Sequence, residues 1–187
     1  MSGEVQNQFD QAITKPLPTI DNNALGKFWP DMLLPLKVFY SPLLRLRFRS
    51  SLTCCCNQVN LACHRIVLRT PEEAFNKLAV EIEQYGIDPP LGVVYVKDCE
   101  GRQVIEGSTQ FYKDSNKTIC CAILRLPEFE ESPYMTLGVT MHELGHLLGL
   151  QHIDDPGSVM YPISKIRPQV LSERDSETLR GIYGNNL

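Results

Sequence analysis

The stretch HELGHLLGLQH, residues 142–152, constrains this chain more than any other feature of its sequence. It holds three of the four histidines found in 187 residues. On a helix, His142 and His146 lie one turn apart on the same face, so both side chains can reach one ion. His152 cannot share that face. Gly149 lies in between, and a glycine can adopt the left-handed conformation that ends a helix and reverses the chain.

These residue types in this order are typical of a catalytic zinc site. Three neutral imidazoles leave a tetrahedral zinc ion one open position for water. Glu143 follows the first histidine, where it can act as general base on the zinc-bound water and pass the proton to a leaving amine. The alternative is a buried amphipathic helix whose histidines are satisfied by hydrogen bonds. The extra glycine and third histidine at fixed spacing favour the metal site.

The pattern HExxHxxGxxH followed by a methionine resembles the metzincin clan of zinc endopeptidases. Met160, in GSVMYP, matches the Met-turn of that clan. HELGHLLGLQH followed by DDPGSVMYP is most similar to the matrixins and their minimal bacterial relatives. LSERDSETLRGIYG, residues 171–184, resembles the matrixin helix that follows the Met-turn, and the close match covers residues 132–184.

The resemblance implies one catalytic Zn²⁺ and a role for each matching residue. The implied zinc ligands are His142, His146 and His152, and the implied catalytic glutamate is Glu143. Met160 is expected to form an apolar floor beneath the metal, and Gly149 to turn the chain towards the third ligand. Asp175 matches a helix aspartate that anchors the Met-turn backbone; the alternative for Asp175 is an exposed, solvated helix charge.

In this clan an edge strand ahead of the active-site helix pairs with the extended substrate. The resemblance assigns that strand to TICCAILRL, residues 118–126. The expected substrate-binding residues are Cys121, Ala122, Ile123 and Pro162. The alternative is an interior strand, which the nearly continuous apolar run also fits.

Three departures from the matrixin pattern limit what can be carried over. Ile153 follows the third histidine where matrixins have serine, which leaves the subfamily open. Pro162-Ile163-Ser164 replaces the matrixin Pro-x-Tyr, so the shape of the specificity pocket is not transferable. His64 is the one histidine outside the motif, so the second zinc of vertebrate matrixins lacks its histidines. The sequence also lacks a PRCGxPD-like cysteine switch.

Hydrophobic periodicity predicts a domain that alternates strands and helices. Predicted strands lie at 34–40, 44–50, 64–69, 91–96 and 118–126. Predicted helices run from Thr70-Pro71-Glu72-Glu73 to Tyr85-Gly86, from Ser132-Pro133 through the histidines, and from Ser172 onwards. With the resemblance, these elements imply an α+β metzincin-like catalytic domain with a twisted mixed sheet, a backing helix, the active-site helix and a C-terminal helix.

The chain is expected to divide into an N-terminal arm or pro-segment, 1–27, and a zinc peptidase domain, 28–187. Within the domain, a Cys-rich segment at 41–69 has no assignment. Seven cysteines, an odd number with adjacent members, favour reduced thiols and a reducing intracellular setting. No signal peptide is visible at the amino end.

The expected function is hydrolysis of internal peptide bonds in protein or peptide substrates. An alternative is a metal-stabilised binding or assembly protein that docks partners through 41–69, and another is a hydrolase of small amides. A net charge of −4 argues against a nucleic-acid partner. No apolar run approaches the ~20 residues of a membrane span.

Overall fold

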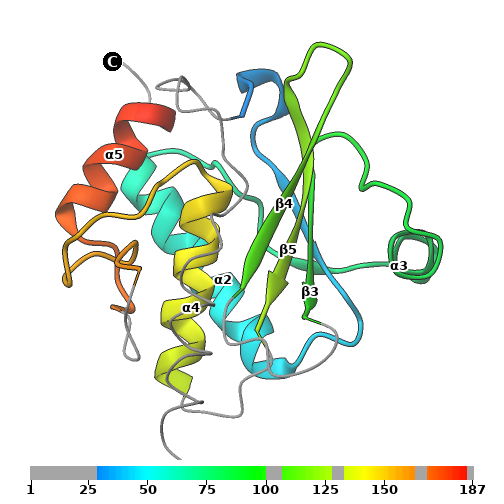
Figure 1. Cartoon of the computed structure of the whole chain (residues 1–187), viewed down its shortest axis with the longest axis horizontal. Helices are drawn as coiled ribbons and strands as arrows, with labels where there is room; N and C mark the ends of the chain where they lie inside the picture. Colours follow the sequence, from blue (N-terminus) through cyan, green and yellow to red (C-terminus); the bar gives the residue numbers. More distant parts are fainter. Residues whose placement is uncertain (1–28, 100–106, 128–132, 163–167, 185–187) are drawn as a thin grey trace, which may run out of the picture.

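The computed structural model of the chain describes residues 29–99, 107–127, 133–162 and 168–184. Its elements in chain order are η1 (Asp31–Leu33), β1 (Lys37–Tyr40), α2 (Leu46–Cys63), β2 (Glu72–Glu73), α3 (Asn76–Glu83), β3 (Val93–Asp98), β4 (Ser108–Lys113), β5 (Ile119–Leu126), α4 (Pro133–Leu147) and α5 (Glu173–Tyr183). Helices α2, α4 and α5 lie on one face of the sheet, and α3 lies on the other (Figure 1). The expected arm at 1–27 lies outside the described residues.

The strands form one mixed sheet in the order β2-β1-β3-β5-β4. All neighbouring pairs are parallel except β4 and β5, which are antiparallel. Strands β3 and β5 are buried along most of their length, as expected for strands that are covered on both faces. The α+β class with a mixed sheet is therefore confirmed, as are the strands predicted at 34–40 and 91–96.

The prediction that residues 118–126 form the edge of the sheet was wrong. β5 pairs with β3 on one side and with β4 on the other; Ala122 is opposite both Val94 and Phe111. The edge is β4, which was not predicted because its residues, STQFYK, are mostly polar and lack an apolar run. The apolarity of β5 reflects its interior position.

The prediction of a strand at 44–50 was also wrong, because these residues lead into the long helix α2. Its buried side chains recur at the three- and four-residue spacing of a helix face: Phe48, Leu52, Cys55, Cys56, Val59 and Cys63. Buried cysteine behaves as a small apolar residue, so the Cys-rich segment supplies a core face. The strand predicted at 64–69 is reduced to one bridge between Leu36 and Leu68.

The thiols of α2 connect it to the other helices of the same layer. The Cys55 thiol donates to the carbonyl of Leu137 in α4, and the Cys63 thiol to the carbonyl of Leu179 in α5, both at 3.7 Å. Burial raises the pKa of Cys56 to about 12. No disulfide joins the seven cysteines, all of which lie within the described residues. The buried thiols Cys55, Cys56 and Cys63 of α2 therefore serve as packing groups.

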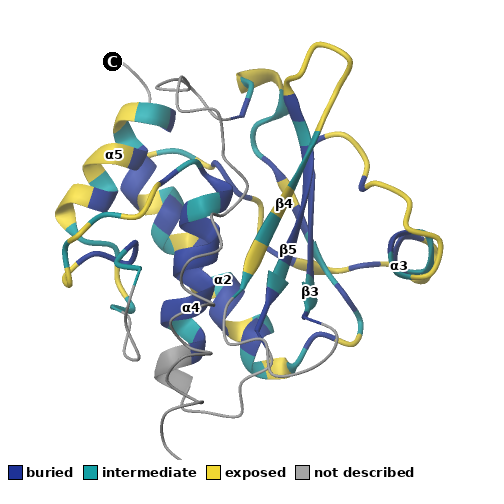
Figure 2. Ribbon diagram, in the orientation of Figure 1, coloured by how far each residue is buried: buried dark blue, intermediate teal, exposed yellow. Residues whose placement is uncertain are grey.

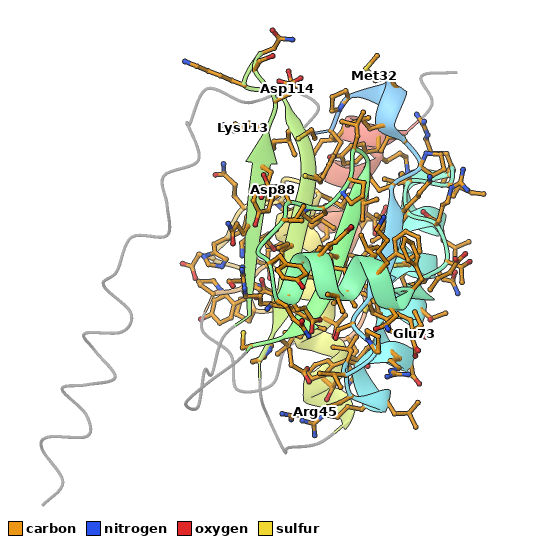
Figure 3. The ribbon with its side chains drawn as sticks, turned by 90° about the vertical axis from the view of Figure 1, so that its right-hand side faces the viewer. Met32, Arg45, Glu73, Asp88, Lys113 and Asp114 are labelled. Carbon is orange, nitrogen blue, oxygen red and sulfur yellow. The ribbon has the colours of Figure 1, made fainter. Side chains whose placement is uncertain are left out.

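The helix start predicted at Thr70–Glu73 was wrong. Glu72 and Glu73 pair with β1 instead, and the backbone N–H of Ala74 donates to the carbonyl of Tyr40. Pairing with the sheet overrides the local capping pattern. The helix that follows, α3, runs only from Asn76 to Glu83 and lies across the sheet in Figure 3. The backing role expected for it belongs to α2, which packs against α4 and α5.

Helix α3 is held to the sheet by one polar contact and a small apolar cluster. The Tyr95 hydroxyl donates to the Glu83 carboxylate at 2.6 Å. Leu78 and Ile82 pack against Tyr95 and Ile123. Of the other residues of α3, Ala79 is buried, Val80, Glu81 and Glu83 are half-buried, and Asn76 and Lys77 are exposed. Helix α4 is buried along most of its described length (Figure 2). No helix among the described residues is long and apolar enough to cross a membrane.

Candidate metal centre

Helix α4 and the turn after it bring three imidazoles to one point. The Nε2 atoms of His142 and His146 are 3.1 Å apart, and the Nε2 atom of His152 lies 3.1 Å from His146 and 3.2 Å from His142. Gly149 makes this possible: its φ is +90°, in the left-handed region. The N–H of Gly149 donates to the carbonyl of His146, and that of Leu150 to the carbonyl of Gly145, which is the Schellman ending of a helix. Gly149 therefore ends α4 and turns the chain towards His152.

Backbone carbonyls fix the orientation of two of the imidazoles. His142 Nδ1 lies 2.7 Å from the carbonyl oxygen of Val159, and His146 Nδ1 lies 3.0 Å from that of Leu150. A carbonyl oxygen can only accept a hydrogen bond, so each Nδ1 carries the proton and donates. The Nε2 atoms of His142 and His146 then present lone pairs to one another, and such an arrangement favours a cation between them.

The arrangement of nitrogen donors fits one zinc ion. A tetrahedral zinc ion with Zn–N distances of ~2.0–2.1 Å holds its ligand nitrogens about 3.3 Å apart. The Nε2 separations of 3.1 to 3.2 Å are close to that value. His142 is buried and His152 is exposed, so the three rings leave one side of the site open to solvent. That is the donor set and access which a catalytic zinc ion requires.

Glu143 is buried next to the imidazoles, with 5% of its surface exposed. The backbone of Gly107, just before β4, lies directly against its side chain. A Cβ added at Gly107 would lie 2.5 Å from Cγ and 2.7 Å from Oε1 of Glu143. The Thr109 hydroxyl also donates to the Glu143 carbonyl, at 3.4 Å. The start of the edge strand is therefore packed onto this residue of the site, and a side chain at 107 would displace that of Glu143.

Met160 is buried against α4, at the position where the resemblance places an apolar floor. It is 1% exposed, and its sulfur contacts the Cα of Gly145 so closely that a Cβ at position 145 would overlap it. Gly145 stands between the two helix histidines. The methionine therefore packs against the part of α4 that carries His142 and His146, and the glycine allows the close approach.

Asp175 anchors the backbone of the Met-turn from α5. Its carboxylate accepts from the Ser158 hydroxyl at 2.6 Å and from the N–H of Val159 at 3.1 Å. It also accepts from the N–H and hydroxyl of Ser172, the N-cap of α5. Because the side chain is only 2% exposed, the anchor prediction is favoured over the solvated charge. Val159 in turn binds His142, so the chain of contacts reaches the metal site.

Two aromatic residues hold the carboxyl end of α4 and were missed in the sequence. The indole N–H of Trp29 donates to the Leu147 carbonyl at 2.8 Å, and the Tyr183 hydroxyl donates to the Leu148 carbonyl at 3.0 Å. Both side chains are fully buried. They satisfy carbonyls that a helix end leaves without partners. The single tryptophan was the available signal for Trp29.

The residues expected to bind substrate are not brought together at one surface. Cys121, Ala122 and Ile123 lie in the interior strand β5 with both neighbours paired. Pro162 is half-buried, just after the Met-turn. Substrate contacts were assigned to Cys121, Ala122 and Ile123 because their strand was expected to have an open edge. Strand β5 has no open edge at these residues.

Comparisons with known proteins agree with this geometry. The family model described as Matrixin matches residues 79–184, which is more than half of the 187 residues. Matrilysin of Felis catus is 47% identical over 51 residues, 26% of this chain and 20% of that protein. Macrophage metalloelastase of Rattus norvegicus is 43% identical over 49 residues, 25% of this chain and 10% of that protein. The chain thus matches a fifth or less of these relatives.

Solved structures with a similar arrangement include myroilysin, with a TM-score of 0.49 and 15% identity over 85% of this chain and 96% of that one. Archaemetzincin from Methanopyrus kandleri has a TM-score of 0.46 and 15% identity over 81% of this chain and 97% of that one. The family assignment rests on the match at 79–184, which includes the histidines and the Met-turn. The chain belongs to the matrixin family of zinc metallopeptidases.

Proposed function

We propose that this protein is a zinc-dependent endopeptidase that hydrolyses internal peptide bonds of protein substrates. The observation that carries the proposal is the position of Glu143, a buried carboxylate on α4 next to His142, the first of three converging histidines. A metal site that only stabilised the fold would need ligands but no adjacent base. The proposal gives Glu143 that role.

His142, His146 and His152 are proposed as the metal ligands. When bound, zinc lowers the pKa of water and polarises the carbonyl of the peptide bond. The protein contributes the orientation of the rings: the carbonyls of Val159 and Leu150 hold two of them in the tautomer that presents Nε2. This fixed geometry reduces the reorganisation needed when a metal or a substrate binds.

Glu143 is proposed to move the proton. Its ionised carboxylate accepts a proton from the attacking water and delivers it to the nitrogen of the leaving amine. The side chain is confined by α4 on one side and by the backbone of Gly107 on the other. This confinement keeps the carboxylate beside the imidazoles, where the water must lie.

The edge strand β4 is proposed as the surface that binds substrate. Among the described strands, β4 stands at the end of the sheet order, so one of its edges is not paired within the sheet. An extended peptide can add to such an edge through backbone hydrogen bonds. Because Gly107 and Thr109 contact Glu143, a peptide aligned on this strand passes close to the proposed base.

The alternative of a metal-stabilised assembly protein rested on 41–69 as a docking surface. The cysteine-bearing face of α2 is buried in the core, which argues against docking through the cysteines, while Leu46 and Leu61 of the same helix are exposed. The alternative remains an outcome of the experiment that follows.

The test combines metal content with cleavage of a peptide library whose amino and carboxyl ends are both blocked. Blocked ends exclude exopeptidases, so cleavage identifies an endopeptidase. We expect about one zinc per chain in the wild type and in Glu143→Ala, and a loss of cleavage of about 10²–10⁴-fold in the variant. Glu173→Ala, which removes an exposed glutamate of α5, is the matched control and should cleave like the wild type.

Two results would contradict the proposal. One is zinc in both proteins with cleavage in neither, persisting after removal of residues 1–27; this outcome supports the assembly protein. The other is equal cleavage by wild type and Glu143→Ala, which would assign the proton transfer to another group.

A further inference from the structure

A cavity of about 220 Å³ opens on the sheet face that carries α3. The residues that line it are far from the histidines in the sequence and belong to other elements. Its apolar lining comes from residues 32–35, which include part of η1, and from Leu91 and Gly92 just before β3. Its charged lining is Lys37 of β1 and Arg69. The volume corresponds to roughly seven water molecules at ~30 Å³ each, enough for a small organic ligand.

The two cations stand side by side because of the way the sheet pairs. Leu36 and Leu68 form a parallel bridge and are both fully buried. Lys37 and Arg69 are the next residues on these two segments. Side chains alternate between faces along a strand, so both cations point away from the buried leucines and towards the same side. Adjacent like charges on one face of a sheet are destabilising unless an anion lies between them.

No such anion comes from the described part of the chain. The lining of the cavity contains no acidic residue, and neither Lys37 nor Arg69 forms an ion pair with a described residue. Asp31, the acidic residue of η1, pairs instead with Arg65 at 3.7 Å. The positive charge at this end of the cavity is therefore available to a ligand.

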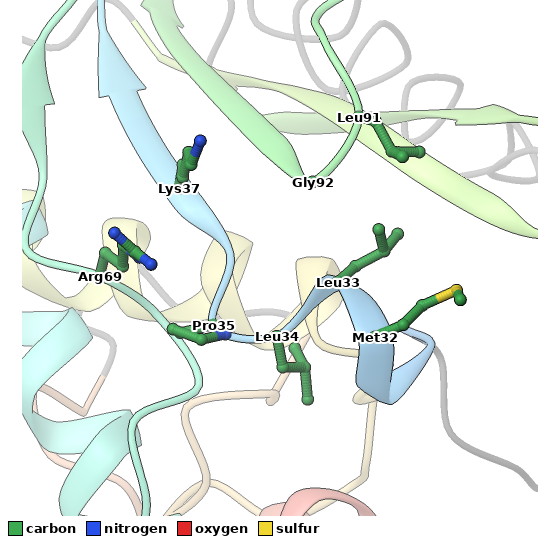
Figure 4. A pocket seen from close by; sticks show the side chains of 8 residues that line it. All are labelled: Met32, Leu33, Leu34, Pro35, Lys37, Arg69, Leu91 and Gly92. Atoms are coloured by element: carbon green, nitrogen blue, oxygen red, sulfur yellow. The ribbon is translucent and has the colours of Figure 1, made fainter.

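The opposite end of the cavity is apolar and open to solvent. Met32 is 88% exposed and Leu91 is 67% exposed. Figure 4 shows Lys37 and Arg69 grouped at one end, and Met32, Leu33 and Leu91 at the other. Exposed apolar side chains beside a cavity gain free energy when a hydrocarbon group covers them. The charged end of the cavity can thus bind an anionic group, and the apolar end can bind a hydrocarbon group of the same ligand.

We propose that this cavity binds a small amphipathic carboxylate, with the carboxylate between Lys37 and Arg69 and the hydrocarbon over Met32, Leu33 and Leu91. Charge complementarity selects the head group, because Arg and Lys bind carboxylates through charge-assisted hydrogen bonds. The lining selects an aliphatic tail. Two sources share this chemistry, a short fatty acid and the carboxyl-terminal residue of a peptide. The site is separate from the metal centre and does not rest on the proposed peptidase activity.

The test is a titration of the zinc-loaded full chain, followed by backbone amide NMR shifts. The probes are hexanoate, its uncharged analogue hexanamide, and N-acetyl-alanyl-leucine with a free carboxylate. We expect saturable shifts at Leu33, Lys37 and Gly92 with hexanoate, and binding of hexanamide about tenfold weaker because the charged contact is lost. Binding of the peptide probe at the same amides would identify peptide ends as a source, whereas binding of hexanoate alone would identify fatty acids.

Charge-neutral variants test the two cations. Lys37→Gln with Arg69→Gln should weaken hexanoate binding about tenfold or more, with no loss of melting temperature and an unchanged zinc content. The matched control is Lys113→Gln with Lys117→Gln, which removes the same charge from two exposed lysines, one at the end of β4 and one in the turn that follows. Equal binding of hexanamide and hexanoate, equal weakening by both double variants, or no saturable shift at the cavity would each overturn the proposal.

Discussion

The two faces of the sheet are covered to very different depths. On one face, α2, α4 and α5 share a continuous core that extends from Trp29 to Tyr183. On the other face, the short α3 covers only a small cluster around Tyr95 and Ile123. The difference is visible in Figure 2, where α4 is mostly buried and the segment around α3 is mostly exposed.

The depth of packing on each face of the sheet corresponds to the kind of site found there. The histidines, Met160 and Asp175 belong to the deeply covered face, where side chains are fixed by packing and by buried hydrogen bonds. A catalytic site requires such support, because its groups must be held close to one geometry. The thinly covered face leaves an open cavity instead. Dense packing and open space are thus divided between the two sides of one sheet.

Matched leucine substitutions test this comparison most strongly. Leu52 of α2 is fully buried on the deep face, and Leu78 of α3 is 3% exposed on the thin face. We expect Leu52→Ala to lower the free energy of unfolding by about 4 kcal/mol and Leu78→Ala by about 2 kcal/mol. The deep core cannot collapse around the vacated space, whereas α3 can shift. Urea unfolding measures both values, and equal losses would break the comparison.

Asp175→Ala should destabilise the deep face by about 3 kcal/mol, because it leaves the hydroxyl and N–H donors of the Met-turn buried without an acceptor. Zinc should also bind more weakly, since Val159 holds both Asp175 and His142. Thermal unfolding and zinc titration measure the two effects. Glu177→Ala, an exposed acid on the same helix, is the control and should change stability by less than about 0.5 kcal/mol. Similar losses in both variants would show that the buried network contributes little.

The metal site could be predicted because its determinants are local. His142, His146 and His152 occupy one helix and one turn, and the left-handed Gly149 is enough to place the third beside the first two. The positions of Met160 and Asp175 came from the resemblance to a family. Their contacts join α4 to α5 across the fold, and no short-range pattern reports such contacts.

The errors in predicting the fold have the opposite origin. Residues 44–50 alternate apolar and basic side chains like a strand. In the structure, however, residues 46–50 begin the helix whose buried face continues through the cysteines. Glu72 and Glu73 look like a helix start until β1 offers them partners. Strand β4 gave no apolar signal, so the edge was assigned to its neighbour. For Glu72 and Glu73 a partner distant in sequence decides the local structure, and a distant contact, with Glu143, also explains why Gly107 was missed.

Gly107→Ala tests whether the catalytic geometry depends on the sheet edge as well as on the deep core. The added methyl would push the Glu143 side chain away from the imidazoles. If the proposed function is right, kcat/KM should fall about 10–100-fold, because misplaced catalytic groups lose orientation, while zinc content and melting temperature stay unchanged. Gly181→Ala, where a Cβ meets nothing within 4 Å, is the matched control and should keep full activity. Unchanged activity in Gly107→Ala would show that α4 alone positions the glutamate.

The smallest expected effect compares buried thiols on the two faces at alkaline pH. Burial raises the pKa of Cys56, on the deep face, to about 12. Burial, with a contact to Cys120, raises the pKa of Cys121 to about 12 as well. Cys121 shares the orientation of Ile123, towards α3, because side chains alternate along β5. An unfolded cysteine has a pKa near 8.5.

Since the folded pKa lies above the unfolded one, each thiol contributes stability that is complete below about pH 8.5 and is lost as the pH rises towards 12. At pH 10 the loss should be about 1.5–2 kcal/mol per thiol. Urea unfolding at pH 8 and pH 10 should therefore show a smaller decrease in Cys56→Ala and in Cys121→Ala than in the wild type, by similar amounts. Cys54→Ala, which removes an exposed thiol, should leave the decrease unchanged. A flatter curve in Cys56→Ala alone would mean that water reaches β5 from the thin side. Equal flattening by both variants would mean that water is excluded from the centre of the α3 face as fully as from the core beneath α4. The weaker covering of the α3 face would then be limited to its margins, where the cavity lies.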